Sequence, residues 1–132
     1  AFWESTIAMI LDHPLLGIGW GSYFMVYPNY DYYMQGNFIK IVHAHNMYLN
    51  FMAEIGLFGF ASYMVCFFGV IYKAFKAHVM KLDILVKAMF LGIGLGLSAL
   101  ALNGFTDYVM FNTELSMLVW LFSGIVVSGY KN

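Results

Sequence analysis

The chain has 132 residues, of which 62% are apolar and only 10% are charged. A soluble domain carries about 25% charged residues, because a surface that faces water needs them. A soluble fold of this length could not bury so much apolar surface. The net charge is −1 and all six basic residues are lysines, which excludes a basic patch for nucleic acid. Composition therefore predicts a protein embedded in a membrane.

Residues 1–46 precede the first long apolar run and begin with a predicted amphipathic helix that ends at Pro14. One stripe of this helix is apolar and consists of Trp3, Ile7, Ile10 and Leu11. The closely spaced glycines of residues 17–21 predict an irregular turn. Neither a charged region nor a small-residue cleavage site follows Ala1, which is not typical of a signal peptide. We expect the chain to be the C-terminal part of a longer protein.

Tyrosines are concentrated in one short stretch of this segment. Five of the ten lie there: Tyr23, Tyr27, Tyr30, Tyr32 and Tyr33. Tyrosine is enriched at membrane–water interfaces, where its ring is apolar and its hydroxyl is hydrated. Aromatic faces with polar tips also suit carbohydrate, whose CH groups pack on rings while its hydroxyls form hydrogen bonds. Composition leaves both interpretations open.

Three apolar runs follow. A helix rises about 1.5 Å per residue, so about 20 residues cross a hydrocarbon core of about 30 Å. We predict membrane-spanning helices over residues 47–72, 88–106 and 115–130, the third with the least margin. Gly92 and Gly96 have the spacing that lets a neighbouring helix approach closely. The predicted fold class is all-α: a polytopic membrane protein with three transmembrane helices after an extracytoplasmic loop that carries a short amphipathic helix.

The lysines predict how these helices are oriented. The loop 73–87 contains four lysines against one acid, Asp83, and short lysine-rich loops stay in the cytoplasm. The loop 107–114 contains Asp107 and Glu114 and no lysine, as an external loop would. We therefore expect residues 1–46 to be extracytoplasmic and the C-terminus to be cytoplasmic.

Polar residues cluster where the external segment enters the first span. If a helix begins near His43, a rotation of 100° per residue places His43, Asn50 and Glu54 within about 40° of one another, with Asn46 at the edge. Polar groups at the mouth of a span are costly unless they pair or face a water-filled cavity. The set could thus line a site, or it could form hydrogen bonds between helices while His43 and His45 contact lipid headgroups.

The sequence gives less support to a metal site, to a site at a second polar cluster or to a nucleotide site. His43 and His45 would point in nearly opposite directions on a helix, and on a strand no third ligand lies near them in sequence, so we predict no metal and no cofactor. Asp12-His13-Pro14 is a second polar cluster that is also typical of a helix end. The glycines of residues 17–21 have no preceding strand and no following Lys-Ser/Thr, which argues against a nucleotide site.

Two elements of the chain resemble those of the O-antigen ligase and polymerase superfamily. After Trp3 and the amphipathic helix, residues 13–19 read HPLLGIG and resemble the family's hPLLGiG element. Residues 45–50, HNMYLN, with residues 54–59, EIGLFG, resemble its HN-x-(Y/F)-L…E-x-G-(L/I)-x-G element. Both occur in the expected order, and the resemblance runs from about residue 3 to 60.

The resemblance implies a polytopic glycosyltransferase of the bacterial cytoplasmic membrane. Such an enzyme moves a glycan from a polyprenyl-diphosphate carrier to a lipid, polysaccharide or protein acceptor on the outer side, among membrane lipids and without a nucleotide sugar. His45 matches the family's histidine and would act as general base towards an acceptor hydroxyl or as a donor to the diphosphate leaving group. An imidazole, with an ordinary pKa of about 6.5, suits either role. The family's usual arginine would lie upstream of Ala1.

Six further side chains are candidates for substrate binding in this interpretation: His13, His43, Asn46, Tyr48, Asn50 and Glu54. Two other hypotheses remain. The chain could belong to a transporter, permease or flippase-like protein in which Glu54 and Asp107 line a path for solute or protons, or to a structural or assembly subunit. The sequence does not distinguish ligase from polymerase.

Overall fold

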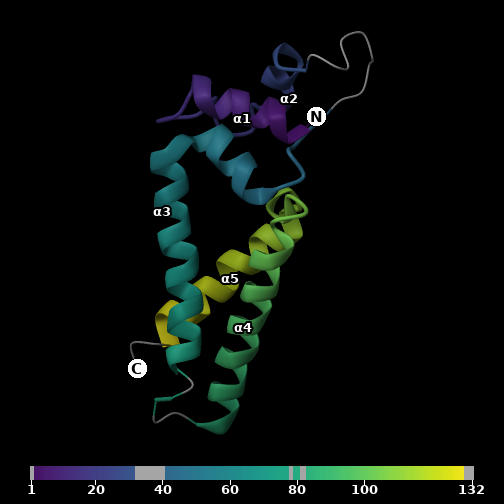
Figure 1. Ribbon diagram of the computed structural model, residues 1–132. Helices are drawn as coiled ribbons and strands as arrows, with labels where there is room; N and C mark the ends of the chain where they lie inside the picture. Colours follow the sequence, from purple (N-terminus) through teal and green to yellow (C-terminus); the bar gives the residue numbers. More distant parts are fainter. Residues whose placement is uncertain (1, 32–40, 78, 81–82, 130–132) are drawn as a thin grey trace. The chain divides into compact units, whose positions relative to one another are not determined.

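The computed structural model describes residues 2–31, 41–77, 79–80 and 83–129. Across these residues the chain is helical and contains no strand, so the predicted all-α class is confirmed (Figure 1). The elements are α1 (Phe2–Asp12), α2 (Tyr23–Val26), η1 (Tyr27–Asn29), α3 (Met47–Ala77), α4 (Ile84–Asn103), η2 (Val109–Phe111) and α5 (Thr113–Gly129). Some residues on which the sequence-based predictions rest lie outside the described residues. These are Ala1 at the start of the chain, Tyr32 and Tyr33 of the tyrosine stretch, Lys81 of the loop 73–87, Lys131 near the C-terminus that we expect in the cytoplasm, and the end of the predicted span 115–130.

The chain divides into two compact units, which are described separately. The first consists of Ala1–Ser62 with Gly104–Tyr108, and the second of Tyr63–Asn103 with Val109–Asn132. α3 contributes to both, since it begins in the first unit and ends in the second.

In the first unit, α1 ends at Asp12, as Pro14 predicts, but it buries its more polar face. The buried residues of this helix are Ser5, Thr6 and Met9, whereas Trp3, Ile7 and Leu11 of the predicted apolar stripe are exposed. A soluble helix would bury this stripe. Its exposure is instead what a helix at a lipid interface requires.

Two of the clustered tyrosines belong to the core of the first unit. Tyr23 and Tyr27 are buried and their rings stack with centroids 5.6 Å apart. The Tyr23 hydroxyl lies 2.7 Å from Oγ1 of Thr6 in α1, and burial raises the pKa of Tyr23, so it is a neutral phenol. These two rings are therefore neither interface anchors nor exposed platforms for sugar, the two interpretations that composition had left open.

In the second unit, the end of α3 packs with α4 and α5 around one apolar core. Its buried members are Phe67, Ile71, Ala74, Ala77, Phe90, Ile93, Leu97, Ala101, Val119 and Val126. α3 and α4, with 31 and 20 residues, are long and apolar enough to cross a membrane, and α5 is a shorter apolar helix of 17 residues. Many large apolar side chains on these helices are exposed, Val65, Leu102 and Trp120 among them. A core helix of a soluble protein would bury such side chains, so lipid is their natural surrounding. The third span stays a prediction.

The close helix approach in this unit occurs at Gly94. A Cβ added there would lie 3.3 Å from Cβ of Ala74 and from the ring of Phe75, whereas one at Gly92 or Gly96 would meet no described atom within 4 Å. Among the described residues no helix therefore uses the Gly92–Gly96 spacing, because α4 turns the glycine between them towards α3, and a close approach at this pair stays a prediction.

Gly94→Leu should destabilise the second unit, because the added side chain would overlap Ala74 and Phe75. Overpacking of this kind costs about 1–3 kcal/mol, so we expect a lower midpoint of thermal unfolding for the full-length protein in detergent. Gly92→Leu is the matched control, since it replaces a glycine of the same helix where a Cβ meets no described atom within 4 Å. Equal losses of stability in the two variants would contradict the packing at Gly94.

Candidate functional site

α3 is interrupted at Gly56, whose backbone angles (φ 64°, ψ −176°) are not helical, and Figure 1 shows the helix changing direction there. The segment Pro14–Gly19 lies against this interruption. The N–H groups of Ile18 and Gly19 donate to the carbonyls of Ala53 and Glu54, each at 2.9 Å, and the N–H of Leu57 donates to the carbonyl of Pro14 at 2.8 Å. Helix ends leave such groups unpaired, so residues 14–19 supply partners to both halves of α3. We call this arrangement the backbone clasp.

Glycines make the clasp possible. Gly17 has φ +72° and Gly56 has φ +64°, a region that side chains rarely adopt. A Cβ on Gly17 would lie 2.5 Å from the carbonyl carbon of Glu54, and a Cβ on Gly56 would collide with the carbonyl of Leu15. The HPLLGIG and EIGLFG elements thus meet through backbone atoms that only glycine leaves accessible.

Glu54 anchors the loop that follows the clasp. Its side chain is buried, with 4% of the residue exposed, and its carboxylate accepts hydrogen bonds from the N–H of Gly21 and from the N–H of Tyr23, the latter at 3.3 Å. These contacts support a positioning role for Glu54, and its direct contact with substrate stays a prediction.

Asn46 fixes where α3 begins. Its Oδ1 accepts a hydrogen bond from the N–H of Leu49 at 3.0 Å, which makes it the N-cap, and its Nδ2 donates to the carbonyl of Phe105 at 3.0 Å. The N–H of Met47 donates to the carbonyl of Gly104 at 2.7 Å. α3 thus begins at Met47, where the predicted span 47–72 begins, and the alignment considered for a helix from His43 does not apply because the cap leaves the histidines in the preceding turn.

That turn is held from both sides at Ala44, which lies between the histidines. The N–H of Ala44 donates to Oδ1 of Asn50 at 3.0 Å, and its carbonyl accepts a hydrogen bond from Nε1 of Trp3 at 3.1 Å. Asn50 is fully buried, and its Nδ2 has no hydrogen-bond partner among the described residues. Its contact with substrate also stays a prediction, since the structure gives it a clear role in fixing the turn.

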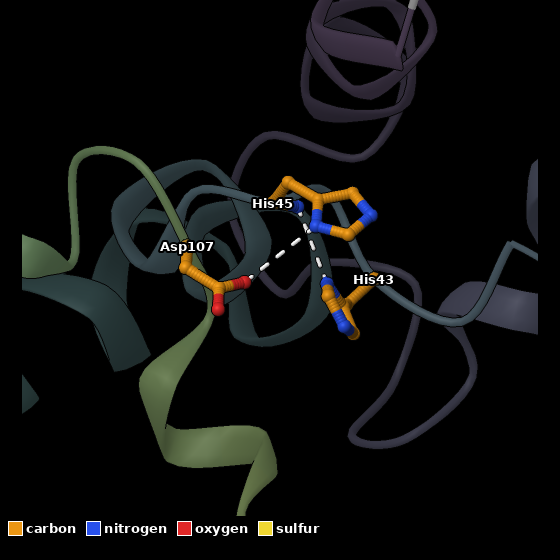
Figure 2. A group of neighbouring side chains, drawn as sticks. All are labelled: His43, His45 and Asp107. Atoms are coloured by element: carbon orange, nitrogen blue, oxygen red, sulfur yellow. Dashed lines mark hydrogen bonds and ion pairs between the residues drawn. The ribbon is translucent and has the colours of Figure 1, made fainter.

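Figure 2 shows the group that results: His43, His45 and Asp107. Nδ1 of His45 lies 3.5 Å from Oδ1 of Asp107, and the side chains are 56% and 55% exposed. The rings of His43 and His45 meet edge to face, with centroids 4.3 Å apart, and the N–H of His45 donates to Nδ1 of His43 at 3.3 Å. His45 has φ 51°, which costs a non-glycine residue about 1–3 kcal/mol and persists only where its surroundings enforce it.

Residues 1–64 match the family model of the O-antigen ligases. The resemblance is therefore confirmed over a range that contains the clasp, Asn46 and His45. No curated protein and no solved structure matches the chain. Together with the apolar helices α3 and α4, the match indicates a membrane enzyme of the O-antigen ligase or polymerase kind, active in polysaccharide biosynthesis.

Asp107 lies beyond the range of the O-antigen ligase match. The sequence suggested a role for it only in the transporter hypothesis, on a path with Glu54, and gave no sign that it lies beside His45. Two hydrogen bonds from the start of α3 to residues 104 and 105 bring it to His45. It also opposes the effects of burial and of His45, which together lower the pKa of His43.

The remaining predicted residues lie around this group or apart from it. The ring of Tyr48 packs on Phe105 with centroids 4.6 Å apart, so it also supports the loop that carries Asp107. His13 is exposed just after α1, where its carbonyl accepts a hydrogen bond from the N–H of Gly17 at 3.0 Å. Substrate binding by either residue stays a prediction.

Gly17→Ala should open the clasp, whereas Gly21→Ala should not. Both glycines have φ near +70°, where alanine costs about 1–2 kcal/mol, but a Cβ at Gly21 would meet no described atom within 4 Å. We expect amide hydrogen exchange at Ile18 and Gly19 to accelerate in the Gly17 variant and to change little in the Gly21 variant. Equal exchange in both variants would show that strain alone, and no overlap with α3, governs this segment.

Asn46→Ser and Asn46→Ala separate the two roles of Asn46. Serine retains an N-cap oxygen but cannot reach Phe105, and alanine loses both bonds. Loss of a cap costs about 1 kcal/mol, so the alanine variant should unfold at a lower temperature than the serine variant, and both below the parent. A serine variant no more stable than the alanine variant would contradict the assignment of Asn46 as N-cap.

Proposed function

We propose that the chain is part of a glycosyltransferase that moves a glycan from a polyprenyl-diphosphate carrier to an acceptor hydroxyl, with His45 at the reacting centre. The carrying observation is the O-antigen ligase match over residues 1–64. The family's histidine corresponds to His45, which is exposed, held in an uncommon backbone conformation and paired with a carboxylate. Such features are common where side chains are positioned for chemistry.

The proposed reaction forms a bond between the acceptor oxygen and the anomeric carbon of the glycan, and it breaks the bond from that carbon to the diphosphate. His45 accepts the proton of the acceptor hydroxyl as this bond forms. Because Nδ1 of His45 faces Asp107, the carboxylate favours the tautomer that carries its proton on Nδ1, which leaves Nε2 free to act as the base. Asp107 is thus a positioning residue in this mechanism.

The diphosphate leaves with negative charge that cations must stabilise. The resemblance implies an essential external arginine, and this sequence contains no arginine. The arginine that the resemblance implies would therefore lie outside this sequence. His43, beside His45, would orient the base or bind sugar. The acceptor would be a lipid, a polysaccharide or a protein.

The lysine distribution supports an orientation for this reaction. Residues 1–46 and 107–114 would lie outside the cytoplasmic membrane, and residues 73–87 would lie in the cytoplasm between the spans 47–72 and 88–106. The span 115–130 would return the chain to the cytoplasm. His45 and Asp107 come from the two segments assigned to the same side, and their contact in the first unit supports the placement of both segments on one side of the membrane.

His45→Ala should lower glycan transfer by about 10²–10⁴-fold, the usual contribution of a general base. Transfer would be measured with the purified full-length protein and a lipid-linked glycan, after membrane insertion has been shown to be normal. Asp107→Asn should cause a smaller loss, because it acts through His45, and Glu114→Gln should cause none. Intact transfer in the His45 variant would refute the role of this residue, and lost uptake of a solute would favour a transporter.

A further inference from the structure

His43, His45 and Asp107 are also a set of metal ligands. Each offers one donor atom, and these atoms all lie within 4.8 Å of one another. Two donors come from the turn before α3 and the third from the loop after α4 (Figure 2). No third ligand lies near the histidines in sequence, and folding supplies that ligand from a distant part of the chain.

The spacing of the donors suits a small tetrahedral ion. Bonds of about 2.0–2.2 Å in tetrahedral geometry place donors roughly 3.3–3.6 Å apart. The 3.5 Å from Nδ1 of His45 to Oδ1 of Asp107 already has this value. Because no two donors are more than 4.8 Å apart, a donor of His43 would need to approach by at most about 1.5 Å, which rotation of an imidazole that is only partly buried can provide.

The backbone under the three side chains is fixed independently of any ion. The start of α3 is tied to the loop of Asp107 by the bonds of Asn46 and Met47, and Ala44 is held at both its N–H and its carbonyl. A ligand set whose supporting groups are already in place loses less entropy on binding an ion. Because His45 and Asp107 are more than half exposed, a fourth position remains open to water or to an anionic oxygen.

We propose that His43, His45 and Asp107 bind a divalent transition-metal ion of the Zn²⁺ class, and that the bound ion inhibits glycan transfer by occupying the imidazole of His45. Two imidazoles and one carboxylate favour zinc, cobalt, nickel or copper over magnesium and calcium, which prefer oxygen ligands. The inhibition rests on the proposed function, whereas the binding does not.

Binding is tested with Co²⁺, whose visible absorption reports tetrahedral coordination, on the purified full-length protein in detergent. We expect one saturable site per chain, displacement of Co²⁺ by Zn²⁺ and no displacement by Mg²⁺. His43→Ala and Asp107→Asn should each weaken binding by at least tenfold. His13→Ala removes an exposed histidine outside the group and should leave binding unchanged. Absence of a saturable signal, or an equal loss in the His13 variant, would overturn the site.

Inhibition is tested by adding Zn²⁺ to the transfer reaction. We expect the parent protein to lose transfer activity at the Zn²⁺ concentration that displaces Co²⁺ from the site. The Asp107→Asn variant should need at least tenfold more Zn²⁺ to lose the same fraction of its own activity. Transfer that is insensitive to Zn²⁺ at saturation of the site would overturn the inhibitory role. If His45→Ala leaves transfer intact while Co²⁺ binding is lost, the proposed function fails and the metal site stands.

Discussion

The first unit depends on the hydrogen bonds that the HPLLGIG segment makes with α3 at Gly56. A helix that breaks within an apolar sequence exposes carbonyls at the end of one half and N–H groups at the start of the next, and each is costly where water is scarce. The segment satisfies groups of both kinds with its own backbone. Two backbones can approach this closely only where Cβ atoms are absent, which explains why glycine occurs at both positions 17 and 56.

The clasp connects to the histidine turn through α1. Glu54 lies next to the interruption, and its carboxylate accepts a hydrogen bond from the N–H of Tyr23. The hydroxyl of Tyr23 in turn forms a hydrogen bond with the hydroxyl of Thr6 in α1. At the start of the same helix, Trp3 donates to the carbonyl of Ala44, between the two histidines. The two elements that resemble the O-antigen ligase family are thus linked twice, directly at the clasp and indirectly across α1. Because these bonds are buried or partly buried, losing one partner would leave the other unsatisfied.

Features with a local cause were predictable from the sequence, and those that depend on distant backbone atoms were not. α1 ends just before Pro14, and the two long apolar runs form the helices α3 and α4, as expected. α3 begins at Met47, where the predicted span 47–72 begins, whereas the polar stripe considered for a helix from His43 does not form because Asn46 caps the helix after the histidines. α1 exposes its apolar stripe and buries two hydroxyl side chains, and Tyr23 buries its hydroxyl, whereas folded proteins usually bury apolar groups in preference to polar ones. Periodicity shows which residues share a face but cannot show which face meets lipid or protein.

Asp107 shows why part of a site can escape sequence comparison. The loop that carries it is held to α3 chiefly through the carbonyls of Gly104 and Phe105. Any residue provides a carbonyl, so these contacts place no demand on side-chain identity and leave no motif. The O-antigen ligase match ends at residue 64, yet the neighbour of His45 lies beyond it. The matched range therefore contains the histidine and the cap of α3, while the later loop places a carboxylate beside it, and in the proposed mechanism this carboxylate selects the tautomer of His45.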